Sequence, residues 1–524
     1  MAASHSFKLL FFLFLLHSLH IITVTTTMLC HDHERSALLH FKQSLPASSS
    51  SSAYSKTASW KASGNSSRDC CSWDGVECDD ATGYVIGLDL SSSLMQATLH
   101  SKSTLFSLVH LQSLNLAENY FMNSSIPPEI SRLSSLSFIN LSNSLFSGQI
   151  PHELSGMSKL ASLDLSFNYL YGDFPIAIFN LSGLLVLNVS RNQNLSGYLP
   201  EFNTTSPFRE LDIAHTKFSG TIPSSIGNLK SLNKLRLRNC YFSGSIPTSI
   251  GNMTQLTYLS LAYNMFNKSD DLSWLQKLTK LSKLNLEDTN LYGYLPPSFA
   301  NFTQLTILSL AVNRFVGEIP LCLMNMTQLK TLDLSFNALT GQIPRSFSQL
   351  KNLEHLSLSH NNFTGVEADI FFSSRNLAIL SLSGCKITLN SPHHSNFSLP
   401  KLAILELFRC NLTEFPYFLQ FASNLRALVL GENNIHGNIP HWIWHASNKL
   451  ELINLRDNFL TAFENPLAIQ SKSLRYIDIS NNMLQGNLPI PPPNTYLYSV
   501  QKNRIPGELS PMMCGVSKIT RFVR

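Results

Sequence analysis

Leucine and other large apolar residues recur along this chain with one dominant spacing. Each period opens with Leu-x-x-Leu-x-Leu, and one full unit from Leu160 reads LASLDLSFNYLYGDFP. The opening position recurs every 23 to 26 residues, mostly 24, at 85, 111, 136, 160, 184, 208, 232, 256, 281, 305, 329, 353, 377, 402, 425, 450 and 474. Chance does not produce seventeen copies in register, so residues 85–493 are predicted to form seventeen structural repeats.

The alternation within each period predicts one short strand. In Leu-x-Leu both leucines point into a core and the intervening residues point outward. Strands of successive repeats then stack into a parallel sheet with a solvated concave face. A polar residue three positions after the second Leu turns the chain, because its side chain bonds to backbone groups that have left the sheet. Period and pattern are those of a leucine-rich repeat, which predicts an α/β solenoid.

This turn position carries a small side chain able to hydrogen bond in every repeat. It is occupied by Asn119, Asn168, Asn192, Asn264, Asn313, Asn337, Asn361, Asn433, Asn458 and Asn482, and elsewhere by Ser93, Ser144, Thr216, Thr289, Cys240, Cys385 and Cys410. The three cysteines are therefore expected to be buried residues of this row. Cys322 and Cys514 are also expected to be buried free thiols.

The second half of many repeats carries Leu/Phe-x-Gly-x-Ile-Pro, as in FSGTIPSSIGNLKSL, FSGSIPTSIGNMTQL and LTGQIPRSFSQLKNL. Gly permits a tight turn, and Pro has no backbone N–H to leave unpaired. This pattern closely resembles the plant extracellular class of leucine-rich repeats. The resemblance implies a second short strand after the turn position and a right-handed superhelical twist.

Residues 1–29 are typical of a secretory signal peptide. Lys8 precedes the apolar run LLFFLFLL, which is shorter than the roughly 20 apolar residues that span a bilayer. The following segments CHDHERSALLHFKQSL and DCCSWDGVECD are similar to the N-terminal cap of plant receptor-like proteins and kinases. Residues 30–80 are therefore expected to form a cap, with Ala37, Leu38 and Phe41 on the inward face of an amphipathic helix.

Four cysteines lie in the expected cap. The resemblance implies the disulfides Cys30–Cys70 and Cys71–Cys78, and a secreted chain meets the oxidising conditions that disulfides need. A zinc site is the competing interpretation. Adjacent Cys70 and Cys71 lack the usual ligand spacing for zinc, so no metal site is predicted.

Two further segments resemble plant receptor-like proteins that include fungal-resistance receptors: SDDLSWLQKLTKLSKLNL (269–286) and PIPPPNTYLYSVQKNRIPGELSPMMC (489–514). Members of that family continue with more repeats, a C-terminal cap, a membrane helix and a short tail. Residues 494–524 are expected to hold a degenerate eighteenth repeat and a truncated end. The sequence is therefore expected to be a fragment or a prematurely ended gene model, with a natural truncated form as the alternative.

Composition agrees with a secreted glycoprotein. Charged residues make up only 14% of the chain, about half of the usual quarter, so Ser, Asn, Thr and sugar must cover much of the surface. A net charge of +5 over 524 residues provides no concentrated basic stripe for nucleic acid. The Asn-x-Ser/Thr acceptors expected to carry sugar are Asn65, Asn123, Asn140, Asn180, Asn188, Asn194, Asn203, Asn252, Asn267, Asn301, Asn325, Asn362, Asn396 and Asn411.

Candidate ligand contacts are the outward strand positions that depart from Ser, Asn, Thr or Asp. Three charged clusters do so: Lys234, Arg236 and Arg238 in repeat seven; Glu354, His355 and His360 in repeat twelve; and Glu451, Arg456 and Asp457 in repeat sixteen. The first cluster is a candidate contact for an acidic ligand, since Arg is enriched at interaction hot spots. An ordinary solvated face is the alternative for all three.

Aromatic residues next to the turn position or two before it form a lateral line that can bind a ligand or simply pack. They are Phe167, Tyr263, Phe336 and Phe408. Asn140 and Asn188 lie between strand leucines, so sugars there would block parts of the early concave surface.

The resemblance implies a non-enzymatic recognition ectodomain, in defence or developmental signalling, that binds a peptide, protein or glycan ligand. It further implies the extracellular side of the plasma membrane for the full-length form, and signalling through a single-pass receptor kinase. As written, the chain is expected to be secreted to the apoplast. A soluble decoy, or a secreted inhibitor of cell-wall-degrading enzymes similar to polygalacturonase-inhibiting proteins, is the alternative. No catalytic set or cofactor is predicted, since no Ser/His/Asp or Cys/His group has local support.

Overall fold

A computed structural model describes residues 29–46, 55–61, 69–367, 370–371, 374–388, 399–444, 447–464, 468–469, 471, 473–505 and 521–523. Residues 1–28 of the expected signal peptide, residues 506–520 and Cys514 lie outside the described residues. The chain divides into two compact units. One comprises Met1–Ser147 and Pro151–Leu160, and the other Gly148–Ile150 and Ala161–Arg524.

The first unit combines the cap with the first ladder strands. Its elements include α2 (Asp32–Gln43), η1 (Lys56–Ser59), η2 (Cys70–Ser72), β1 (Val76–Cys78), β2 (Val85–Asp89), η3 (Thr104–Ser107), β3 (Ser113–Asn115), η4 (Pro128–Arg132), β4 (Phe138–Asn140) and η5 (His152–Gly156), where η denotes a 3-10 helix. Ala37, Leu38 and Phe41 are buried on α2, as their spacing predicts. The disulfides join Cys30 to Cys70 and Cys71 to Cys78, so these four cysteines offer no free thiolate to a metal.

Strand β1 covers the edge of the first repeat, a feature that the repeat pattern does not predict. It pairs antiparallel with β2, whereas β2, β3 and β4 pair in parallel. The buried Glu34 of α2 accepts a hydrogen bond of 2.8 Å from the backbone N–H of Val85, where β2 begins. The cap therefore satisfies backbone groups that a terminal repeat would leave unpaired.

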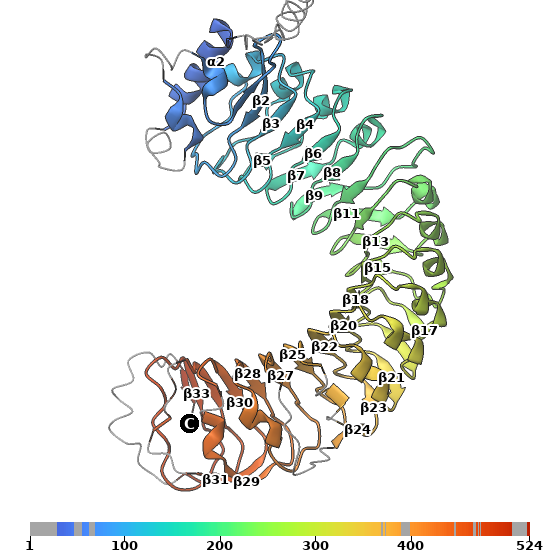
Figure 1. The fold of residues 1–524 in the computed structure, drawn as a ribbon, viewed down its shortest axis with the longest axis vertical. Coiled ribbons are helices and arrows are strands. Elements are labelled where there is room, and N and C mark those ends of the chain that lie inside the picture. The colour runs from blue at the N-terminus through green and yellow to red at the C-terminus, as the bar shows by residue number, and fades with distance from the viewer. Residues whose placement is uncertain are drawn as a thin grey trace, which may run out of the picture. The chain divides into compact units, whose positions relative to one another are not determined.

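The second unit is built on one parallel ladder of short strands (Figure 1). They are β6 (Ser162–Asp164), β8 (Val186–Asn188), β10 (Glu210–Asp212), β12 (Lys234–Arg236), β14 (Tyr258–Ser260), β16 (Lys283–Asn285), β18 (Ile307–Ser309), β20 (Thr331–Asp333), β22 (His355–Ser357), β25 (Ile379–Ser381), β27 (Ile404–Glu406), β28 (Ala427–Val429), β30 (Leu452–Asn454), β32 (Tyr476–Asp478), β33 (Leu497–Ser499) and β34 (Arg521–Val523). Within this unit, β18, β20 and β22 lie on the inner side of the curved stack. The predicted solenoid with a parallel concave sheet is confirmed.

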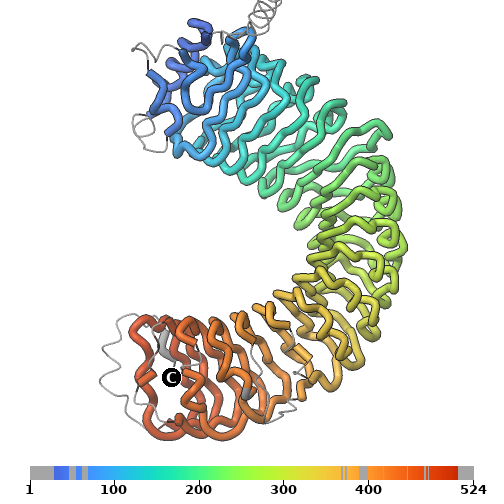
Figure 2. The backbone as a smooth tube through the Cα atoms, viewed as in Figure 1, coloured from blue at the N-terminus to red at the C-terminus, as the bar shows by residue number. Residues whose placement is uncertain are grey.

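The ladder keeps the register that the 24-residue period predicts. Leu211 pairs with Leu235, Leu235 with Leu259, and Leu259 with Leu284, and the side chains of all four are buried. Figure 2 shows the successive coils of the second unit stacked one on the next. The degenerate repeat fits the same register, because Tyr498 pairs with Ile477 and is itself buried. The last strand, β34, pairs with β33 in the same way.

The turn residues connect neighbouring repeats through their side chains. The Asn264 amide donates to the backbone oxygens of Leu237 and Leu261, both at 2.8 Å, and accepts from the N–H of Phe242 at 3.0 Å. Leu237 and Phe242 belong to the preceding repeat. Each such Asn therefore satisfies backbone groups of two repeats at once.

Three thiols occupy this same buried row. Cys240 Sγ lies 3.2 Å from the backbone oxygen of Ile213, and Cys410 Sγ lies 3.3 Å from that of Leu382. Burial raises the pKa of Cys240 to about 11 and the pKa values of Cys385 and Cys410 to about 12. Cys322, expected to be buried, is only half-buried, because it is the second residue of a surface 3-10 helix.

A second set of strands follows the turn position, as the resemblance to the plant extracellular class implies. In the second unit they are β7 (Tyr169–Asp173), β9 (Asn194–Gly197), β11 (Lys217–Thr221), β13 (Tyr241–Gly244), β15 (Met265–Phe266), β17 (Tyr292–Tyr294), β19 (Arg314–Gly317), β21 (Ala338–Gly341), β23 (Asn362–Phe363), β24 (Val366–Glu367), β26 (Ile387–Thr388), β29 (His436–Ile439) and β31 (Phe459–Phe463). Most pair in parallel with the corresponding strand of the next repeat.

The outer segments of most repeats form 3-10 helices. In the second unit they are η6 (Ile176–Asn180), η7 (Ser224–Asn228), η8 (Thr248–Asn252), η9 (Ser273–Lys277), η10 (Pro297–Asn301), η11 (Leu321–Asn325), η12 (Arg345–Gln349), η14 (Tyr417–Phe421) and η15 (His441–Trp444). Most begin directly after a Pro, such as Pro223 before η7. The segment leaves room for about one helical turn, which favours the tighter helix. No helix in the described part of the chain is long and apolar enough to cross a bilayer.

Candidate ligand-binding surface

The inner side of the ladder presents the side chains that flank the buried leucines. On β12, Lys234 and Arg236 lie on either side of buried Leu235 and are half-buried. The register places Glu210 of β10 and Tyr258 of β14 beside Lys234. Each outward position therefore belongs to a column that runs across the repeats, about 4.8 Å from strand to strand.

Each cation of the predicted cluster in repeat seven has a carboxylate partner. Lys234 Nζ lies 2.6 Å from Glu210 Oε1, and Arg236 Nε lies 3.1 Å from Asp212 Oδ2. Arg238 Nη1 lies 3.4 Å from Glu287 Oε2, two repeats further along. The three cationic side chains remain 41, 32 and 35% exposed, so each pair contributes only about 0–1 kcal/mol. The surface is charge-balanced here, where the sequence alone indicated a bare cationic cluster.

Asp212 is the most buried acid of this surface, with 7% of its area exposed. Burial raises the pKa of Asp212 above its ordinary value, while the positive charge of Arg236 acts in the opposite direction. The N–H of Ala214 also donates to the Asp212 carboxylate, at 3.1 Å. Arg236 therefore compensates a carboxylate that is costly to bury.

Two tyrosines from β14 and its following turn complete this surface. The Arg236 Cζ lies 5.2 Å from the centre of the Tyr258 ring, and the Lys283 Nζ lies 5.6 Å from it. The Arg238 Cζ lies 4.6 Å from the ring centre of Tyr263, a separation at which a cation is attracted to the ring face.

The Tyr263 hydroxyl donates a hydrogen bond to Glu287. Desolvation raises the pKa of Tyr263 to about 12, and the hydrogen bond and the charge of Glu287 add to this shift. Sequence reasoning identified Tyr263 but missed Tyr258 and Glu287. The signal for Tyr258 was present, because it occupies the column of Lys234 and Lys283.

The predicted residues of repeat twelve do not form one cluster. Glu354 pairs with Lys330 at 3.0 Å, both exposed. His355 is half-buried on β22, where it pairs with Thr331. The His360 ring stacks on Phe336, with 4.3 Å between ring centres and 21° between planes. Phe336 therefore contacts a histidine of the next repeat on one side of its ring.

The residues of repeat sixteen belong to a larger group. Arg456 Nη2 lies 2.8 Å from Glu432 Oε1, and Arg456 Nε lies 3.6 Å from Asp457 Oδ2. Arg409 pairs with the same Glu432. Both guanidinium groups approach the ring of Phe408, with Cζ to ring-centre distances of 5.3 and 5.8 Å. Sequence reasoning missed Arg409 and Glu432.

Two predicted residues lie outside these contacts. Glu451 lies outside the ion pairs formed within the described residues, and its backbone oxygen accepts from Arg475 and Tyr476 in the ladder. Phe167 has Arg191 at 4.9 Å from Cζ to the ring centre. Phe167 and Phe336 are each about half exposed, so they offer open ring surface beside a cation or a histidine.

Comparison with known families agrees with the architecture. Residues 31–79 match the family described as Leucine rich repeat N-terminal domain, and residues 110–133, 208–229, 231–253, 320–363 and 473–494 match Leucine rich repeat families. The chain is a leucine-rich repeat protein.

This leucine-rich repeat protein is similar to plant receptor-like proteins. It is 45% identical over 138 residues to Receptor-like protein 7 of Arabidopsis thaliana, a stretch that covers 26% of this chain and 13% of that relative. It is 40% identical over 114 residues to Receptor-like protein Cf-9 of Solanum pimpinellifolium, which covers 19% of this chain and 13% of that relative. The matched stretches thus span about an eighth of these relatives.

Its fold is similar to that of solved receptor ectodomains. The ectodomain of the Arabidopsis receptor kinase HAESA, solved with an N-terminally extended IDA peptide hormone ligand, matches with a TM-score of 0.69 and 26% identity. That match covers 94% of this chain and 89% of the HAESA chain.

Twelve of the fourteen predicted sugar acceptors of this leucine-rich repeat protein lie in the described residues, whereas Asn65 and Asn396 do not. Ten of the twelve are exposed: Asn123, Asn180, Asn194, Asn203, Asn252, Asn267, Asn301, Asn325, Asn362 and Asn411. Asn140 and Asn188 are half-buried on ladder strands. The Asn188 amide donates to Asp164 at 2.9 Å, so a sugar there would have to displace this bond.

Proposed function

We propose that this chain is the ligand-recognition part of a plant receptor-like protein, and that it binds a peptide along the ladder strands of repeats six to nine. The observation that carries the proposal is the set of contacts that Arg236 and Arg238 each make with a carboxylate and a tyrosine. Each guanidinium is on a side chain that is about one-third exposed, is held by a carboxylate and lies over a tyrosine ring. Arg and Tyr side chains that are already ordered lose little entropy on binding, which is typical of interaction hot spots.

The similarity to HAESA supports a peptide as the ligand, because that ectodomain was solved with a peptide hormone. The balanced charges of Lys234, Arg236 and Glu287 suit a ligand with groups of both signs better than a uniformly acidic one. Such a peptide would lie across several strands and contact one or two side chains from each repeat.

By the resemblance to receptor-like proteins, the proposed setting is the extracellular side of the plasma membrane, in defence or developmental signalling. By the same resemblance, peptide binding would then be transmitted through a single-pass receptor kinase. Co-purification of such a kinase with the chain after peptide addition tests this step, and recovery that does not depend on peptide would contradict it.

The binding test uses the full chain secreted from plant cells and immobilised. It is exposed to synthetic peptide mixtures of acidic, basic and mixed charge. The wild type is expected to enrich peptides from the mixed set, and the double variant Arg236→Gln/Arg238→Gln is expected to lose at least tenfold of this enrichment. Arg345→Gln is the matched control, because Arg345 is an ion-paired arginine on the 3-10 helix η12, away from the ladder.

Two results would contradict the proposal. One is equal enrichment by the double variant and the wild type, and the other is no enrichment from any of the three mixtures. Thermal melting of each variant shows whether Asp212, left without Arg236, has disturbed the fold.

A further inference from the structure

One repeat of the second unit lacks the 3-10 helix of its neighbours. Residues 198–209 lie between η6 and η7 in the sequence and contain no helical turn. Pro200 and the next core position, Phe208, are eight positions apart. In the preceding repeat the corresponding residues, Pro175 and Leu184, are nine positions apart. An extra residue after Asn192 restores the 24-residue period. This repeat has therefore kept its ladder strand but shortened its outer segment.

The shortening places a serine where other repeats have a large apolar residue. Six positions after the Pro, the neighbouring repeats bury Leu181, Leu229, Met253, Phe302, Met326 and Leu350. The repeat with Pro200 has Ser206 at this position. The Ser206 hydroxyl is buried and has no hydrogen-bond partner within the described residues. An unpaired buried hydroxyl is unfavourable and indicates a missing partner.

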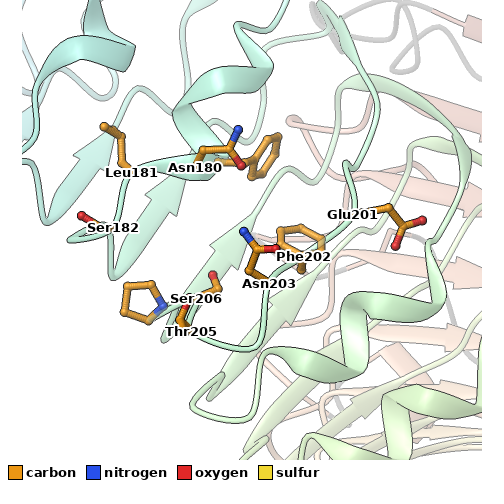
Figure 3. Close-up of a pocket in the computed structure, with 10 residues that line it drawn as sticks. Asn180, Leu181, Ser182, Glu201, Phe202, Asn203, Thr205 and Ser206 are labelled. Atoms are coloured by element: carbon orange, nitrogen blue, oxygen red, sulfur yellow. The ribbon is translucent and has the colours of Figure 1, made fainter.

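A cavity of about 160 Å³ lies against Ser206 (Figure 3). This volume is far larger than one water needs and smaller than the roughly 300–1,000 Å³ of drug-sized ligand sites. Phe179, Leu181 and Phe202 supply apolar wall, and Asn203 and Thr205 supply polar wall. The cavity therefore suits a small group with one apolar and one polar side.

Two sugar acceptors line this cavity, Asn180-Leu-Ser and Asn203-Thr-Thr. Asn203 is exposed, and its backbone oxygen accepts from the N–H of Ser206 at 3.2 Å, so one turn holds both residues. Figure 3 shows the Asn203 amide directed into the gap that it shares with Asn180. Asn180 instead ends η6, in the position where Asn228 ends η7 and reaches back to the backbone oxygen of Phe202. Asn203 is the better placed of the two.

We propose that the N-acetylglucosamine attached to Asn203 occupies this cavity and replaces the missing apolar side chain. In the attachment, the amide nitrogen of Asn203 bonds to C1 of the sugar and loses one proton, and the lipid diphosphate of the donor leaves. After rotation of the Ser206 side chain toward the cavity, its hydroxyl can donate to the acetamido oxygen, and the acetamido methyl can contact Phe202 or Leu181. The inference concerns the outer side of the solenoid and is independent of the proposed ligand surface.

The decisive measurement is the rate at which native glycan is released. The full chain, secreted from plant cells, is treated with a peptide N-glycosidase without denaturant, and each site is followed by glycopeptide mass spectrometry. Asn203 is expected to be occupied and to lose its glycan at least tenfold more slowly than Asn325. Asn325 is the matched control, since it is an exposed acceptor at the end of η11 and does not line this cavity.

A substitution distinguishes a sugar that is bound in the cavity from an Asn203 site that the glycosidase cleaves slowly for another reason. Ser206→Leu restores the side chain of the neighbouring repeats and fills the cavity. In this variant the Asn203 glycan is expected to be released as fast as that of Asn325. Asn203→Gln is expected to lower the melting temperature more than Asn325→Gln does. An unoccupied Asn203, equal release rates at the two sites in the wild type, or unchanged slow release in Ser206→Leu would each overturn the proposal.

Discussion

The Arg238 guanidinium lies over the ring of Tyr263, with 4.6 Å from Cζ to the ring centre. The same guanidinium pairs with Glu287, and the Tyr263 hydroxyl donates to that carboxylate. Arg238 and Glu287 occupy the same column two strands apart, a span of about 10 Å. Ala262 lies between them in the same column, and its small side chain does not block the contact between Arg238 and Glu287. Side chains from three successive repeats thus contact one another on the inner side of the ladder.

Glu287→Gln is expected to lower the pKa of Tyr263 from about 12 toward its ordinary value of about 10, without reaching it, because desolvation remains the largest cause. A spectroscopic titration of this variant, minus the same titration with Tyr263→Phe added, isolates this hydroxyl. Glu354→Gln is the control, since Glu354 pairs with Lys330. An unchanged Tyr263 titration in Glu287→Gln would refute the contact.

The raised pKa of Tyr263 also determines how the stability of the fold changes with pH. The pKa of Tyr263 is higher in the folded chain than in the unfolded chain, so the folded state holds the proton more tightly. The stabilising contribution is complete below about pH 10 and is lost as the pH rises through about 12. Denaturant melts across this range should show a smaller loss of stability in Tyr263→Phe than in the wild type.

Leu332→Asp is expected to destabilise repeat eleven and its neighbours by several kcal/mol, because it buries an unpaired charge in the ladder core. Leu332 is buried and pairs with Leu308 and Leu356. Thr331→Asp, at the adjacent outward position, should change stability little. Hydrogen exchange across β18, β20 and β22 locates the effect, and equal protection in the two variants would argue against this register.

Val312→Asn is expected to stabilise the chain by about 1 kcal/mol, because a β-branched L-residue is strained in the left-handed region, which Asn tolerates better. Val312 has a φ of +55° and is 41% exposed, so no core packing is lost. Val316 is similarly exposed at 38% but lies in strand β19 with ordinary φ, so Val316→Asn should not stabilise. Chemical denaturation of both variants is the measurement, and equal effects would contradict the backbone argument.

The ladder thiols are expected to resist alkylation in the native state. Their pKa values of about 11 to 12 leave almost no thiolate at pH 8, and burial excludes the reagent. Half-buried Cys322 should react with iodoacetamide before these three ladder thiols do. Mass spectrometry of each cysteine peptide before and after unfolding tests this order. Labelling of native Cys385 or Cys410 at the rate of Cys322 would show that their repeats open readily.

The repeat pattern predicted the ladder, its register and the buried row that contains Asn264 and Cys240, because these depend on residues a few positions apart. It did not predict the backbone at the position before this row. There Phe167, Tyr263 and Phe336 all have φ between 52° and 54°. Their residue types do not favour a left-handed backbone, so only the turn, repeated at the same place in each coil, reveals it. Strand β1 was missed because VEC is too short to show a period.

Sequence alone determined that this chain is a solenoid of leucine-rich repeats, because a 24-residue period gives each strand the same neighbours and one burial pattern. The disulfide-bonded cap followed only from the resemblance of residues 30–80 to a known family. Tertiary structure decided which outward side chains meet. Arg238 contacts Glu287, 49 residues away, and Ser206 lines a cavity between repeats, because strand spacing and side-chain reach act between coils. These distances depend on how each coil stacks on the next, which a linear pattern does not contain.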